Sequence, residues 1–345
     1  MFAKLKKILG LTCLALATVF SAAGGAQAQP VTLTFADSFP LTHDLSKERM
    51  VYWMKRAEKL SNGAVTFTHY PAEQLIKARA LFGAISSGTV DAGYIANAYF
   101  TDKLPLNGVA DIPGAISSSV NGSKSYWKFL NEDGPLKSEF LDNNVVPLAF
   151  IVMPPYQLVL RGRAIADLKD LRGLKIRSGG GIQNLTITAV GATPVAMTAP
   201  DIYLGIQRGT LDGTLLSAIS LKPYKLGEVV KSITQNVPFG SPAIGLGMNA
   251  AKFRSLPKNV QSALVQAGHD MVEHLSGYLD GGITEAEAQL KKGGIAVYEP
   301  SAKVQQEIAA RLKTVAADWA KRVGERGLPA DKILADFMDR AKNQR

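Results

Sequence analysis

The sequence predicts an α/β protein in which two similar domains each carry a mostly parallel sheet covered by helices. Strand and helix patterns alternate through residues 31–95, and a comparable alternation returns in residues 174–213. Alternation of this kind is typical of parallel sheets, whose ligands bind at the carboxyl ends of the strands. In addition, about 317 of the 345 residues remain after a predicted leader, which is more than one hydrophobic core usually serves.

The first 28 residues have the features of a secretory signal peptide. Three lysines precede an apolar run of 13 residues, Ile8 to Phe20, and Ala26-Gln27-Ala28 places small residues at a cleavage site. The run is shorter than the roughly 20 residues that span a membrane. The only cysteine, Cys13, lies inside it. We therefore expect a soluble periplasmic protein without disulfides, zinc-thiolate sites or a cysteine nucleophile.

In the first half, we expect strands at 31–36, 64–70 and 89–95, with helices at 45–60 and 75–87 between them. In the second half, the expected strands are 174–177 and 193–196, and the expected helices are 182–190 and 200–207. The two halves end in similar segments. Residues Ile85 to Ala92 and Ile206 to Gly213 share the pattern Ile-x-x-Gly-Thr-x-Asp, with a glycine suited to a helix cap. Chance likeness of two helix ends is the alternative.

From Pro257 the pattern is helical to about Gly293, with an interruption expected near Gly281-Gly282. A short strand at 295–298 follows, and the remainder is helical again. These helices have an apolar stripe and charged outer faces, so we expect them to brace the two halves.

Composition and motifs argue against catalysis. The formal charge is +10, or +7 without the three leader lysines, and it is spread among acids, so we expect no nucleic-acid partner. His269 and Glu273 share a helix face but have no evident third metal ligand. Neither a Gly-x-Ser-x-Gly elbow nor a His-Glu-x-x-His motif occurs. We expect no catalytic residues, no metal and no cofactor, hence not an enzyme.

Arg177 is the strongest binding candidate on physical grounds. It ends a predicted strand before the turn Gly179-Gly180-Gly181, where a side chain can project into a crevice and backbone N–H groups can face an anion. A guanidinium offers paired donors that match a carboxylate. The alternative is an ordinary solvent-exposed arginine at a strand end.

Several motifs resemble the substrate-binding proteins of TRAP transporters, the DctP-like family, and the likeness covers essentially the whole mature chain. The motifs are DLKDLRGLKIR at 167–177, GATPVAM at 191–197, IYLGIQRGTLDG at 202–213, PAEQL at 71–75 and GTVD at 88–91.

The resemblance implies a type II periplasmic-binding-protein fold, in which two lobes with an interdomain cleft close on a ligand and long helices brace them. It implies lobes of residues 30–153 plus 242–281 and 154–241 plus 282–345. Arg177 matches the family's carboxylate clamp. The implied partners are a small organic anion and the TRAP membrane subunits that receive it, and we expect a monomer that catalyses nothing.

Departures from the family pattern bear on the ligand. Sialic-acid binders need polar or charged residues where this chain has Ala78, Ala96, Tyr99, Gln157 and Leu216, so that ligand is not expected. We expect a monocarboxylate with an apolar or aromatic body. The residues expected to line the site with Arg177 are Phe39, Tyr94, Tyr99, Tyr156, Gly180, Leu216 and Phe239, and hydrogen bonds are expected from Ser38, Gln74, Asn97 and Gln157.

Other functions stay open. A dicarboxylate or sugar-acid ligand fits the same fold, as does service to an ATP-driven importer or a sensor kinase. An exported enzyme is the rival from a different class, and it requires a nucleophile or metal cluster that the motifs do not supply.

Overall fold

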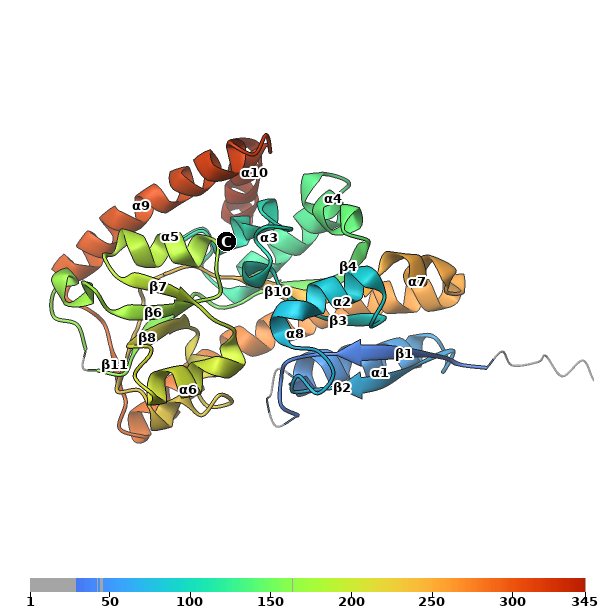
Figure 1. Ribbon diagram of the computed structural model, residues 1–345, viewed down its shortest axis with the longest axis horizontal. Coiled ribbons are helices and arrows are strands. Elements are labelled where there is room, and N and C mark those ends of the chain that lie inside the picture. Colours follow the sequence, from blue (N-terminus) through green and yellow to red (C-terminus); the bar gives the residue numbers. More distant parts are fainter. Residues whose placement is uncertain (1–28, 42, 44–45, 163, 345) are drawn as a thin grey trace, which may run out of the picture.

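A computed structural model describes residues 29–41, 43, 46–162 and 164–344. The predicted leader and Cys13 lie outside the described residues. The chain builds two β-sheets that lie side by side along the long axis of the molecule (Figure 1). Within the described residues, no helix combines the length and the apolar composition needed to cross a membrane.

The first sheet, sheet A, has five strands. Three of its strands are apolar and buried along nearly their whole length, as expected of a sheet covered by helices, whereas the edge strand Val65–Tyr70 is only partly buried. In spatial order the strands are β2 (Val65–Tyr70), β1 (Val31–Ala36), β3 (Ala92–Ala96), β10 (Ala243–Asn249) and β4 (Val145–Val152).

The second sheet, sheet B, has six strands and repeats the strand and helix alternation of the first. In spatial order they are β11 (Ala296–Tyr298), β9 (Ser232–Thr234), β5 (Gln157–Leu160), β8 (Gly213–Leu216), β6 (Lys175–Ser178) and β7 (Thr193–Ala196). Strand β6 is parallel to both of its neighbours, so its carboxyl end shares an edge with theirs.

The α/β class is confirmed, but both sheets are mixed rather than mostly parallel. Strand β10 is antiparallel to β3 and β4, and β5 is antiparallel to β8 and β9. These strands adjoin two of the three passages between the sheets, from β4 to β5 and from β9 to β10, and the third runs through α8 to β11. The expected parallel pairing is therefore found within the strand and helix repeats, where β1 pairs with β2 and β3, and β6 pairs with β7 and β8. The predicted lobe boundaries stay a prediction.

Most of the helices lie where the sequence pattern predicts them, but several differ from the prediction in length. The helices are α1 (Tyr52–Leu60), α2 (Leu81–Ser87), α3 (Ser119–Asn131), α4 (Pro135–Asp142), α5 (Ile182–Ala189), α6 (Ile202–Gln207), α7 (Ala250–Ser255), α8 (Lys258–Lys292), α9 (Ala302–Gly324) and α10 (Ala330–Asn343).

Two of these helices begin later than predicted. The segment Ser46–Val51 before α1 is a π-helix. Before α2, Ala72 and Glu73 have left-handed φ values of 53° and 59°, and the Glu73 carboxylate accepts a hydrogen bond from the N–H of Ala78 at 2.9 Å. A turn thus replaces the first part of the helix that was expected from residue 75.

Helix α8 runs without a break through Gly281 and Gly282, so the predicted interruption is wrong. It contacts α1, α3 and β4 at one end and β11 at the other, which makes it a brace along both sheets. Helix α9 packs against α5, and α10 packs against α3. Packing on both sheets outweighs the modest propensity cost of the glycines, about 1 kcal/mol each.

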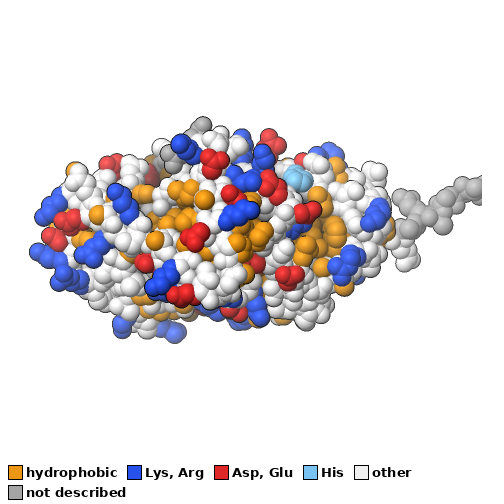
Figure 2. Space-filling model, turned by 90° about the horizontal axis from the view of Figure 1, so that it is seen from above, with side chains coloured by type: hydrophobic (Ala, Val, Ile, Leu, Met, Phe, Trp, Pro, Cys, Tyr) orange, Lys and Arg blue, Asp and Glu red, His pale blue; other side chains and the backbone are white. Residues whose placement is uncertain are grey.

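Charged side chains are dispersed over the surface. On the face seen in Figure 2, Lys and Arg side chains alternate with Asp and Glu, and small apolar areas lie between them. On this face the positive side chains therefore form no single basic patch.

Two glycines of α8 predict opposite effects of alanine. Gly281 is exposed, and a Cβ added to it would meet no atom within 4 Å, so Gly281→Ala should raise the free energy of unfolding by up to about 1 kcal/mol. At Gly268 a Cβ would lie 1.9 Å from the Leu148 carbonyl oxygen, so Gly268→Ala should lower it by about 1–3 kcal/mol. Urea unfolding of both variants checks this. A destabilised Gly281→Ala variant would contradict the unbroken helix.

Candidate ligand-binding site

A small cavity lies at the junction of the two sheets. It offers about 30 Å³ to the centres of water molecules, which is room for about two or three waters. Its wall is mainly apolar and aromatic, with backbone and side chains from both sheets. The lining residues are Phe39, Tyr94, Ala96, Ala98, Tyr99, Met153, Tyr156, Arg177, Gly179, Gln183, Ala199, Leu216, Ser220, Tyr224, Pro242 and Ile244.

Arg177 lies in the wall of this cavity, near the end of β6, and only 2% of it is exposed. Its Nε donates to the carbonyl oxygen of Met197 at 2.7 Å, and its Nη2 donates to the hydroxyl of Tyr99 at 3.2 Å. Among the described residues no carboxylate forms an ion pair with it. The side chain is therefore held in place by neutral acceptors, and the solvent-exposed alternative does not apply.

Tyr99 joins the two sides of the cavity. It ends the 3₁₀ turn Asn97–Tyr99, which follows β3 of sheet A. Its hydroxyl accepts from Arg177 and from the N–H of Ala199, at 2.9 Å, and both donors belong to the sheet B side. Gly180 lies against the same turn, with φ of 129°, and a Cβ there would approach the Ala98 carbonyl oxygen to 2.5 Å. The two sides are thus in contact.

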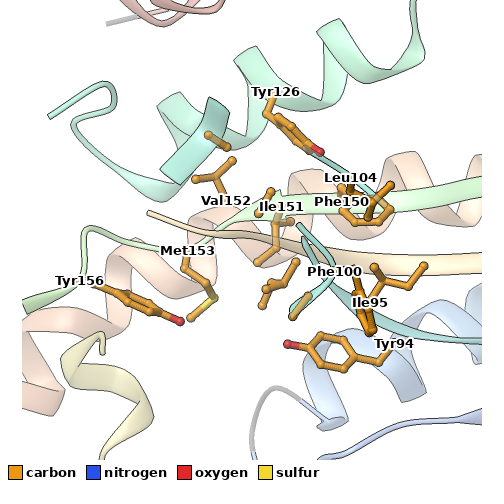
Figure 3. Packing of buried hydrophobic residues seen from close by; sticks show 14 of the residues in the cluster. Tyr94, Ile95, Phe100, Leu104, Tyr126, Phe150, Ile151, Val152, Met153 and Tyr156 are labelled. Carbon is orange, nitrogen blue, oxygen red and sulfur yellow. The ribbon is translucent and has the colours of Figure 1, made fainter. Parts of the chain in front are cut away.

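Six of the residues predicted for the site line the cavity: Phe39, Tyr94, Tyr99, Tyr156, Arg177 and Leu216. Figure 3 shows the rings of Tyr94 and Tyr156 with their hydroxyls turned toward one another, with Met153 close to Tyr156. Ala96, which the sequence comparison with sialic-acid binders singled out, also lines it. The lining residues that were predicted are accordingly mainly aromatic or aliphatic.

The other six predicted residues lie outside the cavity wall, and their part in binding stays a prediction. Asn97 donates to the Tyr126 hydroxyl at 2.7 Å in the core. Gln157 accepts from the Thr234 hydroxyl at 3.0 Å. The remaining four are buried Ser38, exposed Gln74, Gly180 against Ala98, and Phe239, which is 1% exposed.

Sequence reasoning did not single out a polar pair beside Arg177. Gln183, in the first turn of α5, accepts from the N–H of Gly179 at 2.7 Å and donates to a carboxylate oxygen of Asp111 at 3.0 Å. Burial raises the pKa of Asp111 to about 8, although the hydrogen bond from Gln183 and the positive charge of Arg177 oppose that rise. At pH 7 Asp111 is therefore protonated, and the charge of Arg177 is not neutralised by it.

Arg49 is the second buried arginine beside the cavity, and it also escaped the sequence analysis. It lies in the π-helix Ser46–Val51 and is 0% exposed. Its Cζ lies 4.7 Å from the ring centroid of Phe39 and 4.9 Å from that of Tyr94. Burial lowers the pKa of Arg49, while the nearby tyrosines and Asp37 raise it. A π-helical turn is often found at functional sites, and that was not readable from the sequence.

The energetics of Arg49 are unbalanced in the described structure. A cation–π contact contributes about 0.5–2 kcal/mol. Burial of one ionised group costs several kcal/mol unless a partner of good geometry compensates. Its Nη1 and Nη2 have no hydrogen-bond partner among the described residues. The two ring contacts therefore do not offset the burial of this charge.

Four of the neighbouring titratable groups are neutral around pH 7, namely His43, Tyr94, Tyr156 and Tyr224. Burial, with help from the charge of Arg49, lowers the pKa of His43 to about 3. Burial raises the pKa of Tyr94, Tyr156 and Tyr224 well above the usual value. Among the described residues that line the cavity, Arg177 is thus the one that carries a charge. The described residues contain no cluster of three metal-ligating side chains. Such a site suits the binding of an anion.

Comparison with known proteins agrees with this geometry. The family described as bacterial extracellular solute-binding protein, family 7, matches residues 37–322. The C4-dicarboxylate-binding periplasmic protein DctP of Rhodobacter capsulatus is 24% identical over 342 residues, 95% of this chain and 98% of that protein.

Solved structures share the fold. A TRAP periplasmic solute-binding protein of Bordetella bronchiseptica with bound (R)- and (S)-mandelate is 25% identical, with a TM-score of 0.83 over 92% of this chain and all of that one. A marine metagenome TRAP solute-binding protein with 3-hydroxybenzoate is 22% identical, with a TM-score of 0.86 over 92% and 99%. The chain belongs to the bacterial extracellular solute-binding proteins of family 7, the DctP-like substrate-binding proteins of TRAP transporters.

Proposed function

We propose that this chain is exported to the periplasm and binds a small monocarboxylate with an apolar or aromatic body, which it delivers to TRAP membrane subunits. The observation that carries the proposal is the guanidinium of Arg177, held in the cavity wall without a carboxylate partner among the described residues. It acts as the clamp for the ligand's carboxylate. The protein works as a monomer and catalyses no reaction.

The electrostatics favour an anion at Arg177. It is the only charged side chain among the described residues that line the cavity. Two neutral acceptors fix its orientation in advance, so little rearrangement is needed when a carboxylate arrives. Because Asp111 is protonated at pH 7, it does not compete with the ligand for the positive charge.

The shape and polarity of the wall favour a compact apolar body. Phe39, Tyr94 and Tyr224 supply ring surfaces, with centroids of Phe39 and Tyr94 4.9 Å apart, and Leu216 and Ile244 add aliphatic surface. A ring gains from such contacts through burial of apolar area. The mandelate and 3-hydroxybenzoate bound to the two solved relatives are aromatic acids, which supports this ligand class.

Closure and binding are expected to be coupled through Tyr99. Its hydroxyl already accepts from Arg177 and Ala199 across the junction. A carboxylate on Arg177 adds a charged acceptor beside this bridge, so ligand and closed form stabilise one another. The membrane subunits would then recognise the closed, loaded protein.

Removal of the clamp should abolish most of the binding. Arg177→Ala is expected to cost about 2–5 kcal/mol of binding free energy, the range for truncating one partner of a buried charge pair. Arg177→Lys should also weaken binding, because a point charge does not reproduce a bidentate contact. Thermal shift followed by calorimetry with benzoate, mandelate, 3-hydroxybenzoate and succinate measures this.

The exposed Arg311, on the outer face of α9, provides the matched control, since Arg311→Ala removes the same charge far from the wall residues. It should leave every dissociation constant unchanged. An Arg177→Ala variant that binds as tightly as the Arg311→Ala variant would contradict the clamp. Stabilisation by neutral sugars or amino acids alone would contradict the acid ligand.

Binding should weaken at alkaline pH through Asp111. Because the pKa of Asp111 is higher in the folded protein than in the unfolded chain, protonated Asp111 stabilises the folded state at pH values below about 4. This stabilisation is lost as the pH rises through about 8. The carboxylate formed there repels an anion at Arg177, so affinity for benzoate should fall roughly three- to tenfold between pH 7 and 9.5. Asp111→Asn should bind normally at pH 7 and lack this fall. Calorimetry with benzoate at both pH values measures the affinity of the wild type and of Asp111→Asn. An equal fall in affinity in both proteins would show that Asp111 does not cause the pH dependence.

A further inference from the structure

We propose that Arg49 is a second anchor of the site and that the ligand carries a second oxygen acceptor, a hydroxyl or a second carboxylate, at the end of its body away from the clamp. This inference rests on the proposed function, since it presumes an acid held by Arg177. It narrows the ligand class from an acid with an apolar body to an acid with two polar ends.

The first observation is the position of Arg49. Its guanidinium packs on the rings of Phe39 and Tyr94, with Cζ to centroid distances of 4.7 and 4.9 Å, and both rings belong to the cavity wall. The two ring centroids are 4.9 Å apart. The guanidinium is therefore separated from the cavity by the two rings on which it packs.

The second observation is that its donors are unused. Among the described residues, Nη1 and Nη2 of Arg49 have no partner, and Nε meets only the sulfur of Met50 at 3.2 Å. The carboxylate of Asp37, which raises the pKa of Arg49, is already engaged in other contacts. One of its oxygens accepts from the N–H of Phe39 at 2.6 Å and the other contacts His69 at 2.5 Å. A fully buried cation with free donors thus waits for an acceptor.

Comparison with other arginines that stack on rings in this chain shows that ring packing alone does not explain why the Nη donors of Arg49 have no partner among the described residues. Arg340 lies 4.4 Å from the Phe129 centroid and donates from both Nη atoms to Glu132, at 2.8 and 2.7 Å. Arg79 stacks on Tyr99 and is exposed to water. Among the arginines that stack on rings in the described chain, the two without a carboxylate or solvent are Arg49 and Arg177, and both adjoin the cavity.

The two guanidinium groups come from segments associated with different sheets. Arg49 lies before α1 on the sheet A side, and Arg177 lies on β6 of sheet B. Tyr94 and Tyr156 feel the positive charge of both. A ligand with one carboxylate satisfies one cation and leaves the other buried and unpaired. A ligand with an oxygen at each end satisfies both, which is the chemistry that the pair selects.

The test uses three acids on one ring that differ at a single position: benzoate, 3-hydroxybenzoate and isophthalate. Their dissociation constants are measured by calorimetry for the wild-type protein and for Arg49→Met, Arg177→Met and Arg311→Met. Methionine keeps the length of the side chain and removes its charge. The exposed Arg311 is again the control, and the hydroxyl and carboxylate arms show which oxygen Arg49 prefers.

We expect the wild type to bind at least one substituted acid about tenfold more tightly than benzoate, as for one hydrogen bond to a charged group. Arg49→Met should reduce that preference to less than about threefold and leave benzoate binding within about threefold, because only the second contact is lost. Its melting temperature without ligand should be unchanged or higher, since a buried charge is removed.

Several results overturn the inference while leaving the proposed function intact. If Arg49→Met still binds a substituted acid about tenfold more tightly than benzoate, another group contacts the second oxygen. If the wild type binds all three acids equally, no group in the site contacts that oxygen. Loss of benzoate together with the substituted acids means that Arg49 holds the carboxylate itself. An Arg49→Met variant that melts several degrees lower or does not fold assigns the side chain to packing. If no acid binds the wild type, or Arg177→Met binds all three unchanged, the proposed function fails and the inference with it.

Discussion

The guanidinium of Arg177 is buried at the junction of two sheets with neutral oxygens as its only described hydrogen-bond partners. Burial of a charge on these terms is unfavourable unless a counter-charge arrives. The surroundings preserve this condition, because Asp111 stays protonated at pH 7 and the nearby tyrosines stay neutral. Under the function proposed above, the carboxylate of the ligand supplies this counter-charge.

The frame around this arginine is compatible with the lobe closure that the proposed function requires. Strand β6 holds Arg177 at a parallel edge of sheet B, while Tyr99 reaches it from sheet A. The chain passes between the sheets only twice before α8, and α8 packs along both. We infer that a change in the angle between the two sheets would make or break the contacts of the Tyr99 hydroxyl with Arg177 and Ala199.

Regular periodicity made the strand and helix repeats predictable, and the position of Arg177 at a strand end followed from them. Direction was harder, because a sequence does not say which way a side chain turns after a strand. Asn97 turns into the core toward Tyr126, and Gln157 bonds Thr234. The sequence did not single out Arg49, because the stretch Lys47-Glu48-Arg49 is charged and resembles the solvent-exposed face of a helix. A π-helical turn buries it instead, and the unbroken α8 likewise depends on packing that glycines do not reveal.

A crystal structure of the complex with 3-hydroxybenzoate tests the central claim most directly. We predict both carboxylate oxygens within hydrogen-bond distance of the Arg177 guanidinium, about 2.7–2.9 Å, and the ring between Phe39, Tyr94 and Leu216. A carboxylate bound elsewhere, with Arg177 still donating only to Met197 and Tyr99, would contradict it.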